Sequence, residues 1–329
     1  MRRRCGTWEW NGQKASWSRV KGRPPIARVS VSSVSDVPQT RRPELVERSV
    51  DVSVVIVNFN TRDPLERCIR AIQDAIKGVD DEVIVVDNAS EDGSVEMVRQ
   101  KFPNVGVICN ERNLFYTRAT NQGIRLARGR YVLIVNPDVT FLDGSFERMY
   151  AYLERHSEVG AVSPRLVDAD GEAEDCFCRE RTFESCIFNF TLLKHIFPGR
   201  TARINHVHAM RGIGRETVRD VEMVVDMSLL VRRDVLEQIG MLDESFKLYF
   251  CDDDLSLRLR QAGWRLVFLG DVRNRHHRHL SVSQQPPSWL ISMFRQDALV
   301  YSRKHFGAVR TAVLRPLMGV TAALHAVRS

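Results

Sequence analysis

The sequence predicts an α/β protein with a single, mostly parallel sheet flanked by helices. Short, β-branched apolar runs alternate with amphipathic helical segments between residues 52 and 135, which is the pattern of right-handed βαβ units. Polar residues follow several of these runs, as expected where the carboxyl ends of parallel strands border a ligand site. The fold class therefore also predicts where the site lies.

Four strands are expected in the first part of the sheet, over residues 52–57, 83–86, 105–109 and 131–135. The first helix is expected to begin at Asp63-Pro64, with Asp63 as the capping residue and Glu66 completing a capping box. Further helices are expected near 94–101 and 117–128. Strands and helices at this spacing form successive parallel units.

The pattern is irregular from about residue 160 to residue 220 and then becomes regular again. A strand is predicted over 221–232, a helix over 252–262 that ends at Gly263, and a strand over 265–269. Helices over 288–305 and 308–327 form a C-terminal helical extension. The predicted boundaries are a disordered basic tail at 1–49, the main domain at 50–285 and the C-terminal helices at 286–329.

Composition restricts the class of protein further. No apolar run approaches the roughly 20 residues of a membrane span, and no apolar stretch follows Arg2-Arg3-Arg4, so no secretory signal is expected. Seven scattered cysteines without zinc-type spacing favour reduced thiols and a cytoplasmic location. Nucleic-acid binding through the basic tail is disfavoured because no known nucleic-acid-binding fold supports it.

Charge is distributed unevenly along the chain. Residues 1–50 carry 11 Lys/Arg and 4 Asp/Glu, residues 51–270 carry 28 and 35, and residues 271–329 carry 9 and 2. An acidic middle suits a divalent cation, and basic ends suit an anionic lipid surface. A solvated tail and a solvated face explain the same distribution equally well.

The strand ends carry the first candidate site residues. Asp87 stands where a strand stops and could accept hydrogen bonds from a base or ribose, and Phe59 could stack on a base. Alternatively, Asp87 caps a turn and Phe59 belongs to the core. Asp138, in Asn136-Pro137-Asp138, is the type of ligand that Mg²⁺ or Mn²⁺ prefers, although Asn-Pro-Asp is also a common turn sequence.

A second group of candidates lies further along the chain. Asp252, Asp253 and Asp254 begin a predicted helix, where the helix dipole favours acids but does not explain three in a row. One carboxylate could act as the general base for an attacking hydroxyl, and another could bind the acceptor. His276 and His277 on a loop could bind a metal or a phosphate, or belong to a basic patch for acidic lipid.

Taken in order, these motifs resemble family 2 glycosyltransferases with the GT-A fold, especially the bacterial rhamnosyltransferase-like branch. The resemblance covers residues 52–138 and 221–281 and rests on these strings: VSVVIVNFN from Val52, EVIVVDNASEDGS from Glu82, NERNL from Asn110, NQG from Asn121, RGRYVL from Arg128, NPD from Asn136, LLVRR from Leu229, residues 246–254, and His276-His277.

The resemblance implies an inverting transfer of a sugar, possibly L-rhamnose from dTDP-rhamnose, to a cell-surface polysaccharide or lipid-linked glycan. It also implies residue roles: Asp87 contacts the nucleobase, Phe59 lines its pocket, Arg118 and Asn136 line the donor pocket, Asp138 holds Mg²⁺ or Mn²⁺, Asp252 is the catalytic base, and His277, with His276, lies near the metal and diphosphate. Asp254 is assigned to the acceptor or to a supporting role.

This sequence departs from the family pattern at three places. Phe115-Tyr116 stands where Gly-Phe is usual, Val225-Asp226-Met227 replaces a Ser-Gly-Ala-like stretch, and Cys251 replaces an acid before the base. A diverged, non-catalytic nucleotide-sugar or glycan-binding protein is therefore the main alternative. A nucleotidyltransferase would want a Gly-rich loop after the first strand, and residues 58–63 contain no glycine.

The last helix carries an apolar stripe. Its members are Val309, Val313, Leu317, Val320, Leu324 and Val327, with Arg310 and Arg315 among the polar positions. One interpretation is peripheral contact with the inner face of the plasma membrane, where a lipid-linked acceptor would lie. The other is that the stripe docks on the protein's own core or on a second subunit.

Overall fold

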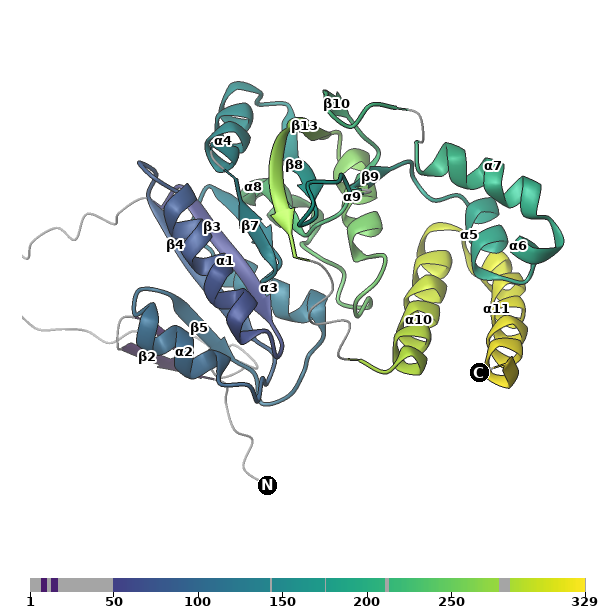
Figure 1. Cartoon of the computed structure of the whole chain (residues 1–329), viewed down its shortest axis with the longest axis horizontal. Coiled ribbons are helices and arrows are strands. Elements are labelled where there is room, and N and C mark those ends of the chain that lie inside the picture. Colours follow the sequence, from purple (N-terminus) through teal and green to yellow (C-terminus); the bar gives the residue numbers. More distant parts are fainter. Residues whose placement is uncertain are drawn as a thin grey trace, which may run out of the picture.

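The computed structural model describes residues 7–10, 13–16, 50–142, 144–174, 176–210, 213–277 and 285–328. The described part contains one 11-stranded sheet in the order β10-β13-β8-β12-β6-β3-β4-β5-β1-β2, with β7 beside β13. Figure 1 shows the parallel strands with α1 and α2 at one end of the molecule and α5, α6, α7, α10 and α11 at the other.

The centre of the sheet is parallel, as predicted. It consists of β5 (Gly106–Cys109), β4 (Asp81–Asp87), β3 (Val52–Asn58) and β6 (Tyr131–Val135). The connecting helices are α1 (Arg62–Ala75), α2 (Ser94–Lys101) and α3 (Tyr116–Leu126). The carboxyl ends of β3, β4 and β6 therefore meet at one edge.

Apolar side chains on both faces of these strands explain why both faces are covered by helices. Val54 and Ile56 of β3 pack in a cluster with residues of α1, α2 and α4 (Ser145–Arg155), whereas Val55 packs in a cluster with residues of α3. All three side chains are buried. The alternation of strand side chains thus separates two hydrophobic cores.

The rest of the sheet is mixed. β12 (Ser228–Arg232) runs antiparallel between β6 and β8 (Val159–Val167), and β13 (Arg265–His276) runs parallel to β8. β10 (Val218–Asp220) and β7 (Val139–Phe141) both pair antiparallel with β13. Because β13 extends seven residues past its predicted end, it carries His276 alongside β7.

The predicted strand over 221–232 is wrong as one continuous element. β11 (Met223–Val224) pairs with β9 (Phe177–Cys178) in a separate two-stranded sheet, and β12 begins only at Ser228. Residues 225–227 leave both sheets. The charged Asp226 would otherwise occupy the middle of an apolar strand, where an unpaired carboxylate is costly.

The remaining helices complete both layers. They are α5 (Phe183–Phe190), α6 (Leu193–Ile196), α7 (Pro198–His208), α8 (Arg233–Ile239), α9 (Cys251–Gln261), α10 (Pro287–His305) and α11 (Ala308–Arg328). α5 to α7 lie in the segment that showed no periodicity. None of the helices in the described part is long and apolar enough to cross a membrane.

Two local predictions differ from the structure. Thr61, not Asp63, is the N-cap of α1, and the Glu66 carboxylate binds Arg70 and Lys101 instead of closing a capping box. Within the predicted tail, β1 (Thr7–Trp10) pairs with β2 (Gln13–Ser16) and with β5. The sequence Asn11-Gly12 is a strong hairpin signal that indicates this pair; the rest of the tail lies outside the described residues.

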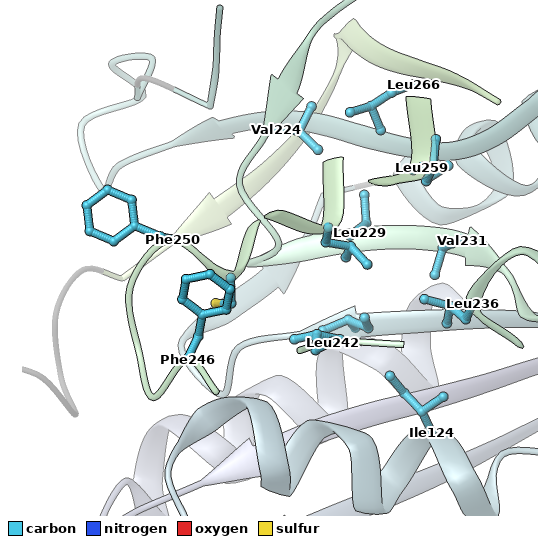
Figure 2. Packing of buried hydrophobic residues seen from close by; sticks show 14 of the residues in the cluster. Ile124, Val224, Leu229, Val231, Leu236, Leu242, Phe246, Phe250, Leu259 and Leu266 are labelled. Atoms are coloured by element: carbon cyan, nitrogen blue, oxygen red, sulfur yellow. The ribbon is translucent and has the colours of Figure 1, made fainter. Parts of the chain in front are cut away.

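A compact apolar cluster fixes the segment that leads into α9. Figure 2 shows Phe246 and Phe250 in the same cluster as Leu229 of β12, Leu242 of the loop before α9 and Leu259 of α9. The backbone of this segment is also held from α10, because the Asp297 carboxylate accepts hydrogen bonds from the amides of residues 247, 248 and 249 at 2.9–3.2 Å. The first turn of α9 is therefore rigidly placed.

Candidate active site

A cavity of about 450 Å³ opens where the ends of β3 and β6 meet the start of α9. Three predicted site residues line it: Phe59 after β3, Asn136 after β6, and Asp252 in the first turn of α9. Trp289 of α10 closes another part of its wall. The cavity thus joins segments that are more than 200 residues apart in sequence.

Asp252 is the member of the acidic run at 252–254 that faces this cavity. Burial raises the pKa of its carboxyl well above the usual range, and the nearby charges of Asp253 and Asp226 raise it further. The amide of Asp253 donates to Asp252 Oδ1 at 2.9 Å. A carboxylate with a raised pKa holds a proton more tightly, which is what a general base for a hydroxyl requires.

The other two acids of the run are neutralised away from the cavity. Asp253 accepts a hydrogen bond from Arg181 Nε at 2.9 Å. Asp254 contacts Arg258 Nε at 2.7 Å, His305 Nε2 at 2.8 Å and Lys304 Nζ at 2.7 Å. Burial opposes ionisation of Asp254, but these partners together lower its pKa. Asp254, predicted for the acceptor or a supporting role, ties α9 to α10.

Asp87 lies beneath the cavity wall in a closed hydrogen-bond network. Its Oδ2 accepts from Asn58 Nδ2 at 2.8 Å, and its Oδ1 accepts from the amide of Ser90 at 2.9 Å. Asp87 is buried and does not line the cavity, whereas the next residue, Asn88, does. Asn58, Asp87 and Ser90, called here the strand-end network, hold the ends of β3 and β4 together.

Asp138 occupies a similar position one residue from the lining residue Pro137. Its Oδ2 lies 3.4 Å from His276 Nε2, and His276 Nδ1 lies 2.9 Å from Glu174 Oε2. Burial opposes protonation of His276, but Asp138 and Glu174 outweigh it and raise the pKa of the imidazole. The pairing of His276 with Val139 between β13 and β7 produces this contact.

His277, predicted beside the metal, is placed differently. Its amide donates to the carbonyl of Asp138 at 2.8 Å, and its Nε2 lies 3.2 Å from Thr140 Oγ1. The structure therefore brings the His276 ring, more than the His277 ring, to the Asp138 carboxylate. β13 ends at His276, so His277 follows outside the strand.

These groups fit a divalent cation that is shared with a phosphate. No group of three or more His, Cys, Asp or Glu side chains in the described part could form a complete metal site. Mg²⁺ commonly uses only one or two protein carboxylates and takes its other ligands from water and phosphate. Asp138, with His276 oriented by Glu174, could supply such a partial site.

Arg118, predicted in the donor pocket, lies outside the cavity lining. It is on α3, its side chain is 56% exposed, and its Nε is 3.9 Å from Glu244 Oε2. It therefore does not join Phe59 and Asn136, the other predicted donor-pocket residues that line this cavity.

Two aromatic lining residues were not assigned roles from the sequence. Phe115 and Trp289 stack with their ring centroids 6.4 Å apart and 19° between planes. Phe115 has φ 65° and ψ 176°, a region almost confined to glycine that costs about 1–3 kcal/mol for other residues. The replacement of the family's usual glycine by Phe115 was the sequence feature that could have revealed this role. Phe115 keeps a glycine-like backbone while its ring lines the cavity.

The comparisons with known proteins agree with this geometry. The sequence model of "Glycosyl transferase family 2" matches residues 53–240. An N-acetylglucosaminyl-diphospho-decaprenol L-rhamnosyltransferase from Mycobacterium tuberculosis is 28% identical over 280 residues, covering 81% of this chain and 89% of the relative. The low-salt glycan biosynthesis hexosyltransferase Agl10 from Haloferax volcanii is 25% identical over 217 residues, covering 64% of this chain and 62% of that protein.

A solved structure supports the fold. The crystal structure of GalNAc-T7 with UDP, GalNAc and Mn²⁺ superposes with a TM-score of 0.56 at 16% sequence identity, covering 77% of this chain and 48% of that chain. This chain thus spans about half the length of that protein, and at this identity the likeness concerns the fold. With a family match over more than half its length, the chain belongs to glycosyl transferase family 2 and is a glycosyltransferase with the GT-A fold.

Proposed function

We propose that this enzyme transfers L-rhamnose from dTDP-rhamnose, with inversion, to a glycan carried on a lipid diphosphate. The observation that carries the mechanism is the Asp252 carboxylate, which faces the cavity with a raised pKa. The rhamnosyltransferase name of the relative that is matched over 89% of its length supports the choice of sugar and acceptor.

In the proposed reaction, Asp252 removes the proton from an acceptor hydroxyl. The oxygen attacks the anomeric carbon from the side opposite the diphosphate, a new glycosidic bond forms, and the bond to the nucleoside diphosphate breaks. Asn136, Asn88 and Phe59 would border the donor. Mg²⁺ or Mn²⁺ held by Asp138 and His276 would neutralise charge on the leaving diphosphate, with the strand-end network supporting the donor wall.

The test is a panel of nucleotide sugars with an N-acetylglucosaminyl-diphospho-polyprenol acceptor, in Mg²⁺, in Mn²⁺ and with a chelator. We expect dTDP-rhamnose to give product only with a divalent cation, and NMR to show an anomeric configuration opposite to that of the donor. Exclusive use of another donor would contradict the rhamnose assignment. A product with retained configuration would contradict the role of Asp252.

We further propose that α11 contacts the cytoplasmic face of the plasma membrane, where such an acceptor resides. Val309, Val313 and Val320 are 80%, 47% and 52% exposed, whereas Leu314 and Met318 face the protein core. The predicted stripe therefore points outward over this stretch, beside exposed Arg310 and Arg315. An outward apolar face with basic neighbours is typical of interfacial helices.

Flotation with anionic liposomes tests this contact in the full-length protein. We expect a variant with Val309→Asp, Val313→Asp and Val320→Asp to float less than the wild type. A control with Gln73→Asp, Gln100→Asp and Gln261→Asp adds the same charge at exposed positions elsewhere. Equal flotation of both variants and the wild type would rule out the α11 contact.

A further inference from the structure

Asp226 is a buried acid to which the proposed chemistry assigns no role. It is only 7% exposed, yet it lines the cavity together with Asp252. One of its carboxylate oxygens, Oδ2, and the buried hydroxyl of Tyr116 have no hydrogen-bond partner within the described part of the chain. Buried polar atoms without partners are rare and call for a functional explanation.

The backbone around Asp226 is fixed on both sides. The amide of Val225 donates to the carbonyl of Cys176 at 3.0 Å, and the carbonyl of Met227 accepts from the amide of Asn136 at 3.0 Å. The position of the Asp226 side chain is thus fixed beside Asn136 in the cavity lining. It also lies close enough to Asp252 for the two charges to repel each other.

This placement puts Asp226 between the proposed donor wall at Asn136 and the proposed base Asp252. In a displacement reaction, the sugar sits between the diphosphate that leaves and the base that activates the acceptor. The segment of Asp226 is bonded to Asn136, on the donor side, and its carboxylate neighbours Asp252, on the base side. Two acids repel a diphosphate, whereas sugar hydroxyls are neutral hydrogen-bond donors.

We propose that Asp226 recognises the transferred sugar by accepting a hydrogen bond from one of its ring hydroxyls, and that Tyr116 positions the Asp226 carboxylate. The Tyr116 hydroxyl lies close enough to Asp226 to lower the pKa of the carboxyl, so it favours the ionised, accepting form without forming a well-aligned hydrogen bond. This inference rests on the proposed function for the existence of a sugar donor, but not on the sugar being rhamnose. It makes Asp226, which stands where the family pattern has a small residue, a determinant of donor specificity.

The test is a thermodynamic cycle that combines two changes. The Asp226 carboxylate is removed from the enzyme, each ring hydroxyl is removed in turn from the donor, and the changes are made separately and together. First, the nucleotide sugar that the wild type uses is identified, and its ring-deoxy analogues are prepared. In the wild type, we expect one analogue to lose about 100-fold or more in kcat/KM, because a site built to bind a hydroxyl rejects a substrate that lacks it. In Asp226→Ala, that analogue and the parent donor should react at similar rates.

Further variants separate recognition from structure. Tyr116→Phe should lower kcat/KM less than Asp226→Ala and keep the preference for the same hydroxyl. Asp226→Asn, which retains an acceptor oxygen, should keep part of that preference. Asp234→Asn removes an exposed acid at the start of α8 and should behave as the wild type. Melting temperatures of all variants show that they fold.

The outcomes are distinct. If Asp226→Ala and every deoxy substitution lower kcat/KM by independent, multiplying factors, Asp226 touches no sugar hydroxyl and the inference is overturned. If the wild type uses no nucleotide sugar at all, the proposed function itself fails. Loss of the preference for one hydroxyl in Asp226→Ala, and in no exposed control, supports the assignment.

Discussion

The carboxylates on the two sides of the cavity differ in how fully they are hydrogen-bonded. In the strand-end network, the buried Asp87 has both oxygens satisfied by Asn58 and Ser90. On the other side, Asp226 and Asp252, called here the acid wall, are brought together with few partners, and the pKa of Asp226 is raised to about 6, mainly by burial. The carboxylate of the first side is fully hydrogen-bonded, whereas the two of the second side line the cavity.

The difference shows that proximity to the site does not by itself identify a reactive acid. A carboxylate whose two oxygens both accept hydrogen bonds is held in one orientation and has its polar atoms satisfied. A carboxylate that is buried beside another acid is destabilised as an ion and becomes a stronger base, at a cost in stability. Substitutions on each side test whether the two sides differ in this way.

The largest expected effect is on catalysis by the acid wall. Asp252→Asn should lower kcat by about 10²–10⁴-fold, because it removes the general base but keeps the shape of the side chain. The folded-state pKa of Asp252 is raised, so the ionised carboxylate destabilises the native state as pH rises from the ordinary carboxyl pKa to the raised one. The variant should therefore melt no lower than the wild type at neutral pH.

Initial-rate assays and thermal melting measure both properties on one preparation. A variant that loses activity and also melts well below the wild type would assign Asp252 to structure, and the contrast with Asp87 would disappear. Asp234→Asn serves as the exposed control.

Asp254 sharpens the comparison because it is two residues from Asp252 but is neutralised. Asp254→Ala should reduce the free energy of unfolding by about 3 kcal/mol, because it leaves Arg258 and Lys304 without their buried partner. Its folded pKa is lowered, so its contribution is present above the unfolded-state pKa and is lost as pH falls through the folded-state value. Urea unfolding at neutral and acidic pH measures this.

The expected loss should be smaller at acidic pH than at neutral pH. An equal loss at both would mean that packing, not the charge of Asp254, holds α9 against α10.

The strand-end network should respond through stability and donor binding. Asp87→Asn places a donor group opposite the donors of Asn58 and Ser90, which should cost about 1–3 kcal/mol of folding free energy. KM for the donor should rise more than kcat falls, because the network shapes the wall that carries Asn88. Chemical unfolding and steady-state kinetics check the two effects.

A fall in kcat as large as that of Asp252→Asn, at unchanged stability, would show that Asp87 takes part in the chemistry and would remove the difference between the two sides.

The smallest expected effect is a shift in pH dependence. The rate should fall as pH drops through the raised pKa of Asp252, because a protonated base cannot accept the acceptor's proton. Asp226→Asn removes a neighbouring negative charge that helps to raise this pKa. The acidic limb of the kcat/KM profile should therefore move to lower pH, whereas Asp87→Asn should leave it in place. If the acidic limb of the Asp226→Asn profile stays in place, the charge of Asp226 does not influence the pKa of Asp252.

Most of the fold could be predicted from the sequence, because its elements are local patterns. The parallel strands and α2, α3 and α9 follow from apolar runs, helical spacing and a glycine stop, and the structure confirms them within a few residues. The predictions failed where a local signal competed with distant contacts. Glu66 occupies the capping-box position in the sequence, but in the structure its carboxylate binds Lys101 of α2.

The site could be predicted only in part for the same reason. Asp252, Asn136 and Phe59 line the cavity as expected, but nothing in the acidic run indicates that Asp254 would meet His305 and Lys304 from α10. Similarly, adjacent histidines look equivalent in sequence. The register between β13 and β7 decides that His276 faces Asp138.

The sequence by itself determined the order of strands and helices, the polar strand ends and the presence of an unusual acid at 226, because propensity and periodicity are properties of neighbouring residues. Only the tertiary structure decided which of its carboxylates are satisfied and which are left to react. Burial and the proximity of other charges set that outcome. Both depend on residues far apart in the chain that folding brings to one cavity.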